Sequence, residues 1–259
     1  MIWTASGRNT FKIISWNADC IQNTIDELAA YIIENDPDVV AMQETFLCPR
    51  LELNITNYIT HRNDRMTHRR GGTAILVKNS IPHHGIQITT NTVEVTAIII
   101  ESHPSNVTIC SLYIPPRSTI RNFIPDILKN FRNRTQCLMV GDFNAKHTSW
   151  SSTTKNNTAG NALTRLVRTS GFLLTAPNRP IRIPDYGRPA TLDIGLSCGL
   201  NKVSAEVFSK LSSDHNPVHF VIFTASSIPY KQNCCKTLTN WYTLQHIIAN
   251  SLPGNPHQQ

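Results

Sequence analysis

The sequence predicts an α/β domain with mixed β-sheets, and three observations lead to this prediction. Short β-branched runs alternate with amphipathic helical segments over residues 1–224. Two neighbouring apolar runs, 93–101 and 107–114, are separated by Pro104-Ser105-Asn106, which predicts a hairpin and hence antiparallel as well as parallel strand pairs. Of the 259 residues 40% are hydrophobic and 16% are charged, enough to bury a sizeable core.

The first third of the chain predicts strand, helix and strand in turn. Residues 11–16 (FKIISW) form a short apolar strand, and 21–35 carry apolar residues at helical spacing. Asp36-Pro37 ends that helix, because the residue before a proline is pushed out of the helical region. The β-branched run 38–42 is the second strand, and Gly71-Gly72 leads into a third over 73–77.

The remaining elements follow the same rules. We expect helices over 120–131 and 159–169, the second ended by Gly171, and strands over 137–140, 193–196 and 218–223. After residue 224 the chain becomes polar and basic. We therefore expect a domain over 1–224 and a linker, or the start of a connector, over 225–259, with one further helix over 238–248.

Charge and cysteine content limit the class of protein. The formal net charge is +7, which favours a polyanionic partner such as nucleic acid. No stretch approaches the roughly 18 apolar residues of a membrane helix, so we expect no membrane partner. Seven cysteines without a CxxC pair indicate a reducing, intracellular compartment, with Cys20, Cys110 and Cys137 as buried thiols.

Polar side chains gather next to the predicted strands. They are Asn17, Asp19, Glu44, Tyr113, Asp142, Asn144, Asp193, Asp214 and His215. Any one of them has a simple alternative, since Asn and Asp after a strand are usually turn formers and His215 before Asn216-Pro217 suits a loop. Carboxylates, amides, a tyrosine and a histidine at equivalent positions together favour a shared site.

The set matches what cleavage of a phosphate diester requires. Glu44 and Asp19 are hard oxygen ligands that suit Mg²⁺, and a buried Asp142 can deprotonate a water molecule. The transition state needs donors, and Asp193 can orient and charge one of them, His215. The other candidate donors are Asn17, Asn144 and Tyr113.

Six motifs in order carry a resemblance to a known family. They are WNAD at 16–19, QET at 43–45, YIPP at 113–116, GDFN at 141–144, TLD at 191–193 and SDH at 213–215. Over about residues 11–223 the chain resembles the endonuclease/exonuclease/phosphatase family. The resemblance implies a DNase I-like four-layer α/β sandwich, two mixed sheets face to face with helices outside. It also implies Mg²⁺, with Mn²⁺ as an alternative, at Glu44 and Asp19, and with Asp214 as a further candidate ligand; whether one or two metals act stays open.

The same resemblance implies roles for the other site residues. Asp142 would activate the attacking water, Asn144 and Asn17 would hold the phosphate or the catalytic groups, and Tyr113 would contact the phosphate. His215, paired with Asp193, would stabilise the transition state. The sequence YIPP (113–116) and the run GDFNAKHTSW (141–150) are similar to the endonuclease domains of non-LTR, LINE-type retrotransposons. In those proteins a reverse transcriptase follows the endonuclease domain.

Basic residues outside these motifs are candidates for contacting DNA. Arg117 and Arg121 follow Tyr113, and the resembling family has a DNA-reaching hairpin near 178–190, which makes Arg179, Arg182 and Arg188 candidates. A second basic cluster has a simpler interpretation, that of keeping a loop soluble; its members are Arg62, Arg65, Arg69 and Arg70. His147 suits either substrate contact or packing, and for Trp150 packing is favoured.

The sequence therefore predicts a Mg²⁺-dependent endonuclease that nicks double-stranded DNA and leaves a 3′-hydroxyl for target-primed reverse transcription, acting inside the cell and in the nucleus. Three alternatives stay open. The first is an abasic-site repair endonuclease of the exonuclease III type, and the second is another phosphodiesterase or phosphatase of the same fold. The third is an inactive nucleic-acid-binding module.

Overall fold

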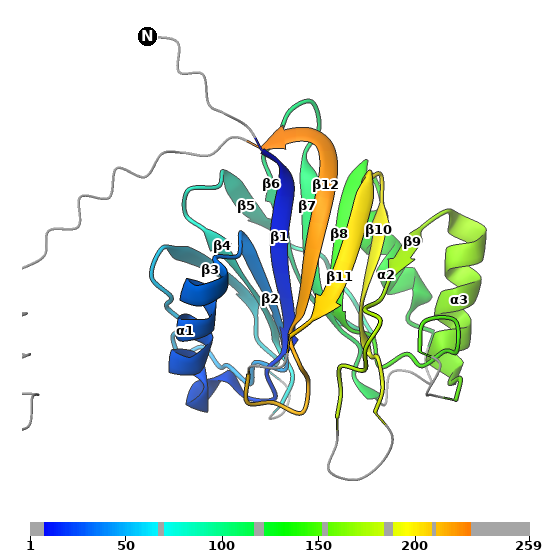
Figure 1. Cartoon of the computed structure of the whole chain (residues 1–259), viewed down its shortest axis with the longest axis horizontal. Coiled ribbons are helices and arrows are strands. Elements are labelled where there is room, and N and C mark those ends of the chain that lie inside the picture. The colour runs from blue at the N-terminus through cyan, green and yellow to red at the C-terminus, as the bar shows by residue number, and fades with distance from the viewer. Residues whose placement is uncertain are drawn as a thin grey trace, which may run out of the picture.

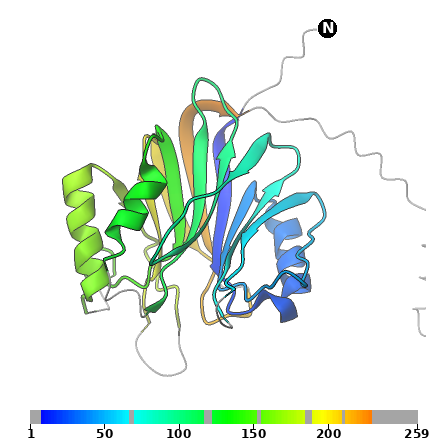
Figure 2. The same ribbon diagram turned by 180° about the vertical axis from the view of Figure 1, so that it is seen from behind.

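The structure is a computed structural model that describes residues 8–66, 70–116, 122–151, 155–183, 189–208 and 211–228. Two six-stranded sheets pack face to face, with one helix outside the first sheet and two outside the second (Figures 1 and 2). The predicted four-layer sandwich is confirmed.

The first sheet has the strand order β11-β12-β1-β2-β4-β3. Its strands are β1 (Arg8–Asn17), β2 (Val39–Gln43), β3 (Tyr58–Asn63), β4 (Thr73–Lys78), β11 (Lys202–Val207) and β12 (Val218–Ile228). Strands β1 and β2 run parallel and the other neighbouring pairs run antiparallel. The sheet is therefore mixed, as expected.

The second sheet has the order β5-β6-β7-β8-β10-β9. Its strands are β5 (His83–Ile86), β6 (Glu94–Ile100), β7 (Val107–Tyr113), β8 (Gln136–Asp142), β9 (Leu173–Thr175) and β10 (Asp193–Cys198). Strands β6 and β7 form the predicted hairpin, with Ile100 opposite Val107. Parallel pairing of β7 with β8 makes this sheet mixed too.

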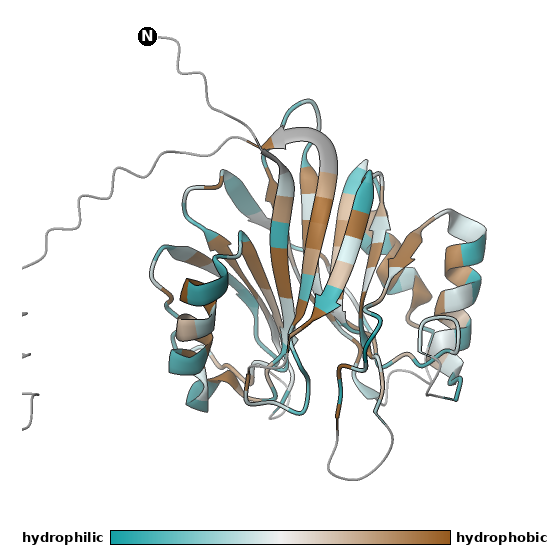
Figure 3. Cartoon of the chain, viewed as in Figure 1, coloured by the Kyte–Doolittle hydropathy of each residue, from teal (hydrophilic) through white to brown (hydrophobic). Residues whose placement is uncertain are grey.

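Successive residues of the central strands point into different apolar layers. Ile13, Val39 and Ile75 lie in the core between the sheets, whereas their neighbours Ile14, Val40 and Leu76 lie in the layer covered by the first helix. Burial on both faces explains why these strands are continuous apolar runs rather than alternating ones. Hydrophobic residues accordingly follow the strands in Figure 3, and the hydrophilic ones collect on the helices and loops.

The helices differ from their predicted bounds at the amino ends. The predicted helix over 21–35 is a 3₁₀ turn, Ile21–Asn23, followed by α1 (Ile25–Asn35), because Thr24 has φ −125° and ψ 13°. Helix α2 (Ile124–Phe131) begins later than residue 120, a position outside the described residues. Helix α3 (Thr158–Ser170) is capped by the Asn157 side chain and ends at Gly171 with φ 73°, as predicted.

Four strands at or near sheet edges were not predicted, namely β3, β5, β9 and β11. Edge strands bury one face at most, and the residues of β11 alternate between exposed and half-buried. The expected boundary at residue 224 falls within β12, whose last residue Ile228 pairs with Arg8. The linker and the helix over 238–248 lie outside the described residues and stay predictions. None of the helices in the described ranges is long and apolar enough to span a membrane.

His219 on β12 makes the stability of this sandwich pH-dependent. Its ring accepts or donates a 2.6 Å hydrogen bond with the Tyr31 hydroxyl of α1 and packs on Phe208, and burial, aided by the charge of Lys12, lowers its pKa to about 4. Between about pH 6.5 and 4 the unfolded chain takes up a proton that the folded chain does not. The free energy of unfolding should therefore fall as the pH drops through this window, by about 2 kcal/mol after allowance for partial exposure.

Denaturant titrations at pH 7.5 and 4.5 measure this loss. His219→Gln keeps a hydrogen-bonding group for Tyr31 but does not titrate, so its stability should change less between the two pH values. An equal loss in the variant and the wild type would show that other groups cause the effect.

Candidate active site

The polar candidates converge at one end of the sandwich, the lower end in Figure 1, because the parallel pairs β1–β2 and β7–β8 all end there. Asn17, Tyr113 and Asp142 are the last residues of β1, β7 and β8. Glu44 directly follows β2, and Asp193 is the first residue of β10. Sequence positions 17 to 193 are thus brought into one cluster across both sheets.

Asp142 is fixed at the centre of the cluster by three hydrogen bonds. Asn17 Nδ2 and Asn144 Nδ2 donate to Oδ2 at 3.0 and 3.1 Å, and the backbone N–H of Asn144 donates to Oδ1 at 2.8 Å. Asn144 reaches its backbone position with φ 46°, which asparagine tolerates better than most residues. Both asparagines therefore hold the carboxylate in one orientation.

Gly141, the residue before Asp142, permits the close approach of β7 and β8. It has φ 143°, and a Cβ there would lie 2.0 Å from the backbone oxygen of Leu112. A side chain would force β8 away from β7 at the point where Asp142 and Tyr113 stand opposite each other. The glycine of GDFN is thus required by packing rather than by chemistry.

Gln43 and Ser111 join the two sheets directly beneath the cluster, and sequence reasoning missed both. Gln43 Nε2 donates to Ser111 Oγ at 2.9 Å, and Ser111 Oγ donates to the backbone oxygen of Met42 at 2.8 Å. Both side chains are fully buried. Buried polar groups that bridge two apolar sheets are the available signal, because the Gln before Glu44 and the Ser within an apolar strand interrupt hydrophobic runs.

His215 is paired with Asp193 as predicted from the sequence. Its Nδ1 lies 2.6 Å from Asp193 Oδ2, and Trp16 Nε1 donates to its backbone oxygen at 3.1 Å. Burial lowers the pKa of the imidazole, but the charges of Asp193, Asp142 and Asp214 outweigh this and raise it to about 9. His215 is therefore an imidazolium at neutral pH, with Nδ1 engaged and Nε2 available to a substrate.

The surroundings of Asp142 disfavour its charged form. It is 2% exposed and stands opposite Asp193 in the β8–β10 register. Burial and the negative charges of Asp193 and Glu44 raise its pKa to about 7, against the opposing effect of His215 and of the Asn144 hydrogen bond. A carboxylate with a pKa near neutrality is suited to accept a proton from water.

Glu44 and Tyr113 form the other side of the cluster. Asn17 Nδ2 donates to Glu44 Oε1 at 2.9 Å, so one amide bridges Glu44 and Asp142. The Tyr113 hydroxyl faces the Glu44 carboxylate, and burial together with the charges of Glu44 and Asp142 raises the pKa of the phenol far above its usual value. Tyr113 is therefore a neutral hydrogen-bond donor.

The donor set fits a hard divalent cation at Glu44. Glu44 is half-buried and anchored by Asn17, and Asp19 is exposed with its backbone N–H bonded to Asn17 Oδ1 at 3.2 Å. Within the described residues no group of three or more His, Cys, Asp or Glu side chains is arranged to hold a metal ion. One or two carboxylates completed by water is the coordination that Mg²⁺ commonly takes in proteins.

The Asp214 side chain is engaged elsewhere. Arg182 Nε donates to Asp214 Oδ2 at 2.8 Å, and Asp214 Oδ1 lies 3.8 Å from His215 Nε2. Backbone hydrogen bonds join Ile183 to Asp214 and Asn216 to Ile181, so the segment with Arg182 lies alongside His215. Arg182, expected to contact DNA, is thus at the edge of the site and already bound to a carboxylate.

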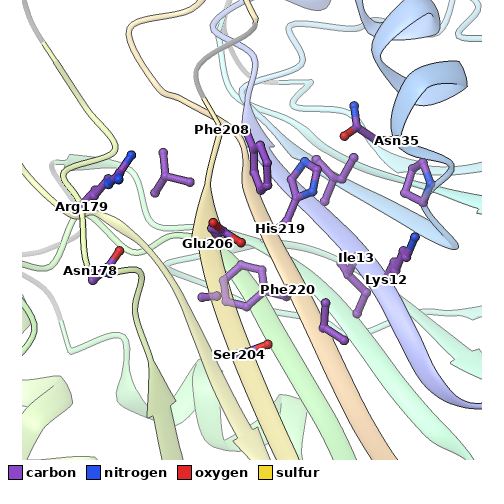
Figure 4. A pocket seen from close by; sticks show the side chains of 15 residues that line it. Lys12, Ile13, Asn35, Asn178, Arg179, Ser204, Glu206, Phe208, His219 and Phe220 are labelled. Carbon is purple, nitrogen blue, oxygen red and sulfur yellow. The ribbon is translucent and has the colours of Figure 1, made fainter.

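Arg179 lies apart from the cluster. It lines a cavity of about 430 Å³ over β11 and β12, together with Glu206, Phe208 and His219 (Figure 4). None of the nine candidate site residues is among the described residues that line this cavity. Three further candidates, Arg117, Arg121 and Arg188, lie outside the described residues.

The solubility interpretation of the second basic cluster is wrong for two of its arginines. Arg62 binds the backbone oxygens of Leu51 and Cys48 and the Asp64 carboxylate. Arg65 forms an ion pair with Glu94 and lies over the Tyr113 ring. Arg69 lies outside the described residues.

The interpretations of Trp150, His147 and the cysteines can also be compared with the structure. Trp150 packs against the apolar layer under α2 and α3, as favoured, and stacks on His147 with ring centroids 5.2 Å apart. His147 bonds to Ser149 within its own loop. Cys110 and Cys137 are buried as expected, whereas Cys20 is half-buried.

Comparison with known proteins gives one family match and several relatives. A family model described as "Endonuclease-reverse transcriptase" matches residues 107–219. A probable RNA-directed DNA polymerase from the transposon X-element of Drosophila melanogaster is 29% identical over 253 residues, covering 94% of this chain and 28% of the relative. The RNA-directed DNA polymerase from mobile element jockey of the same species is 25% identical, covering 82% and 24%. The chain spans about a quarter of the length of these curated relatives.

Solved structures with the same fold include two nucleases. The endonuclease domain of TRAS1, a telomere-specific non-LTR retrotransposon, superposes with a TM-score of 0.68 at 20% identity, covering 82% of this chain and 98% of that one. The AP endonuclease LMAP from Leishmania major gives 0.68 at 15% identity, covering 83% and 88%. The resemblance predicted from the six motifs, and the fold that it implied, are confirmed.

Proposed function

We propose that this chain is a metal-dependent endonuclease that nicks double-stranded DNA. Two findings support the proposal: the chain has the DNase I-like fold, and its relatives include LINE-type transposon polymerases. The observation that carries the proposal is the convergence of a buried carboxylate, Asp142, held by two asparagine side chains, with the imidazole of His215, held 2.6 Å from Asp193. Together they provide a base and a cation at one site.

The chain's own groups divide the chemistry between them. Asp142, held by Asn17 and Asn144, accepts a proton from the attacking water. The water oxygen bonds to phosphorus as the bond from phosphorus to the 3′ oxygen breaks, and that oxygen takes a proton from solvent and leaves as the 3′-hydroxyl. His215 donates from Nε2 to a phosphoryl oxygen while Asp193 holds Nδ1, and Tyr113 donates from its neutral hydroxyl.

Glu44 and Asp19 would hold Mg²⁺ or Mn²⁺. When bound, the ion would neutralise the negative charge of the phosphate. Asp214 is a weaker candidate ligand, because its carboxylate is bound to Arg182.

Supercoiled plasmid provides the direct test. We expect conversion to the open circle in Mg²⁺ and none in EDTA. A DNA polymerase added afterwards should extend from the nicks, because the products carry 3′-hydroxyls. Intact plasmid in Mg²⁺ and in Mn²⁺, with a protein that binds the duplex, would instead indicate an inactive nucleic-acid-binding module.

A second candidate function is favoured by the fold shared with the Leishmania major AP endonuclease, whose TM-score equals that of the TRAS1 domain. Two duplexes that differ by a single abasic site separate the candidates. Turnover that requires the abasic site would assign a repair endonuclease, and cleavage of both would assign the retrotransposon-type nuclease. A small phosphate monoester added as a third substrate tests the phosphatase alternative.

In the full-length protein we propose that a reverse transcriptase follows and uses the 3′-hydroxyl as a primer in the nucleus. This is supported by the relatives, which are described as RNA-directed DNA polymerases and are about four times as long as the matched region. The net charge of +7 supports DNA as the partner.

A further inference from the structure

An ion pair between Arg65 and Glu94 lies next to Tyr113 of the candidate active site. Arg65 follows β3 in the chain, and Glu94 is the first residue of β6. Arg65 Nε donates to Glu94 Oε1, and the two side chains are 14% and 19% exposed. A largely buried ion pair is weak evidence for a role in stability, because the cost of desolvating both charges offsets their attraction. Its neighbours suggest a different role.

The pair is fixed to the turn that precedes β4. Glu94 Oε2 accepts a 2.6 Å hydrogen bond from the backbone N–H of Gly72, and a Cβ on Gly71 would lie 2.2 Å from Arg65 Cζ. The glycines have φ of 87° and 84°, so this contact requires glycine. Their carbonyls accept hydrogen bonds from Phe46 and Thr45, the residues that follow Glu44.

The other face of the pair meets Tyr113. Arg65 Cζ lies 5.8 Å from the centroid of the Tyr113 ring, within the range of a cation–π contact. Glu94 stands opposite Tyr113 in the β6–β7 register. The guanidinium is therefore held by a carboxylate and a glycine turn on one side and lies over the phenol on the other.

We propose that Arg65, oriented by Glu94, is a positioning residue that holds the Tyr113 hydroxyl in its place beside Glu44 for phosphate cleavage. A guanidinium is needed, because two of its nitrogens bind Glu94 while its central carbon lies over the Tyr113 ring, and lysine has no such fork. The proposal rests on the proposed nuclease function. It adds a role for two residues that belong to none of the six motifs.

A double-mutant cycle on plasmid nicking tests it. Arg65→Gln should lower kcat by about tenfold or more with KM little changed, as expected for loss of a group that orients a catalytic side chain. In a Tyr113→Phe background, which lacks the hydroxyl, the same substitution should lower kcat by less than about threefold. Arg65→Lys keeps the charge but not the planar fork, so it should restore only part of the lost rate.

Arg62→Gln is the matched control. Arg62 also pairs with an acidic residue, Asp64, and binds loop carbonyls, and within the described part of the chain its hydrogen bonds and ion pair go to these groups rather than to the site residues. We expect its kcat and KM to stay within about twofold of wild type. Thermal unfolding of each variant verifies that the protein is folded.

Three results would overturn the proposal. One is unchanged kcat in Arg65→Gln, and another is an equal loss in both backgrounds, which a general structural role predicts. The third is a loss confined to KM that shrinks as the salt concentration is raised, which a direct contact of Arg65 with a DNA phosphate predicts. Each requires a wild-type enzyme that nicks DNA; a wild type that fails to nick in Mg²⁺ and Mn²⁺ refutes the proposed function instead, and this inference with it.

Discussion

Asp142→Asn should abolish nicking while leaving the protein folded and, above neutral pH, more stable. Loss of the proton acceptor should lower kcat by ~10²–10⁴, because general-base catalysis contributes about that much. The side chain keeps its size and can still accept hydrogen bonds from Asn17 or Asn144 through its amide oxygen. Plasmid nicking in Mg²⁺ measures the rate, and residual activity within threefold of wild type would remove Asp142 from the mechanism.

The stability of this variant follows from the sign of the pKa shift. The pKa of Asp142 is raised to about 7 by burial and by its acidic neighbours, so the folded protein binds a proton that the unfolded chain has already lost between about pH 4 and 7. Stability from this group is therefore full at low pH and is lost as the pH rises through 7. Asparagine carries no charge to bury, and we expect the free energy of unfolding at pH 8 to rise by about 1–3 kcal/mol.

Chemical denaturation at pH 8 and pH 5 compares the two proteins. The advantage of Asp142→Asn should shrink at pH 5, where the wild-type carboxyl is already protonated. An equal difference at both pH values would mean that the native Asp142 is not destabilised by its charge. Low activity with raised stability would identify Asp142 as a residue kept for chemistry at a cost in folding.

His215→Gln should lower kcat by about 10²–10³, the second large effect, because a donor aimed at the developing charge is lost. Glutamine retains a hydrogen-bond donor without the positive charge, and Asp193 is left without a cationic partner. Asp193→Asn should cost nearly as much alone. The double variant should be little worse than either, since the pair acts as one unit.

The pH profile provides the control for this assignment. The pKa of His215 is raised to about 9 chiefly by Asp193, which overcomes the effect of burial, so the active imidazolium persists at neutral pH and is lost above about 9. The wild-type kcat/KM should therefore fall at alkaline pH, and the fall should be absent in His215→Gln. An unchanged alkaline fall in the variant would assign that titration to another group.

The position of the site could be predicted because its residues adjoin the apolar strands. Asn17, Asp142 and Asp193 each adjoin a buried run, and strands of that kind are the most readable elements of a sequence. The Asp193–His215 pair was predicted as well and is present at 2.6 Å. In these places local sequence and tertiary structure agree.

Contacts between loops could not be predicted in the same way. Arg65 and Glu94 are 29 residues apart, and their pairing depends on where β3 ends in one sheet and β6 begins in the other. The same holds for Arg182 and Asp214. The sequence predicted a DNA contact for Arg182 and a metal ligand for Asp214, but in the structure the two side chains bind each other. Edge strands such as β11 were missed because half of their residues face water and leave no apolar run.

The course of strand β12 sets how far a polymerase joined after this strand would be from the nicked DNA. It begins beside His215 and runs 11 residues to Ile228, which pairs with Arg8 at the opposite end of the sandwich (Figure 1). Val218 stands beside Ser15 and Ile228 beside Arg8, so the two ends of β12 are seven residues apart along β1, or about 23 Å at 3.3 Å per residue. A tether that starts at Ile228 therefore needs roughly seven extended residues to return to the end of the sandwich that carries the site. In a full-length protein with the proposed reverse transcriptase, a graded series of deletions after Ile228 should therefore leave nicking intact and abolish primer extension once the tether is too short to cover that distance.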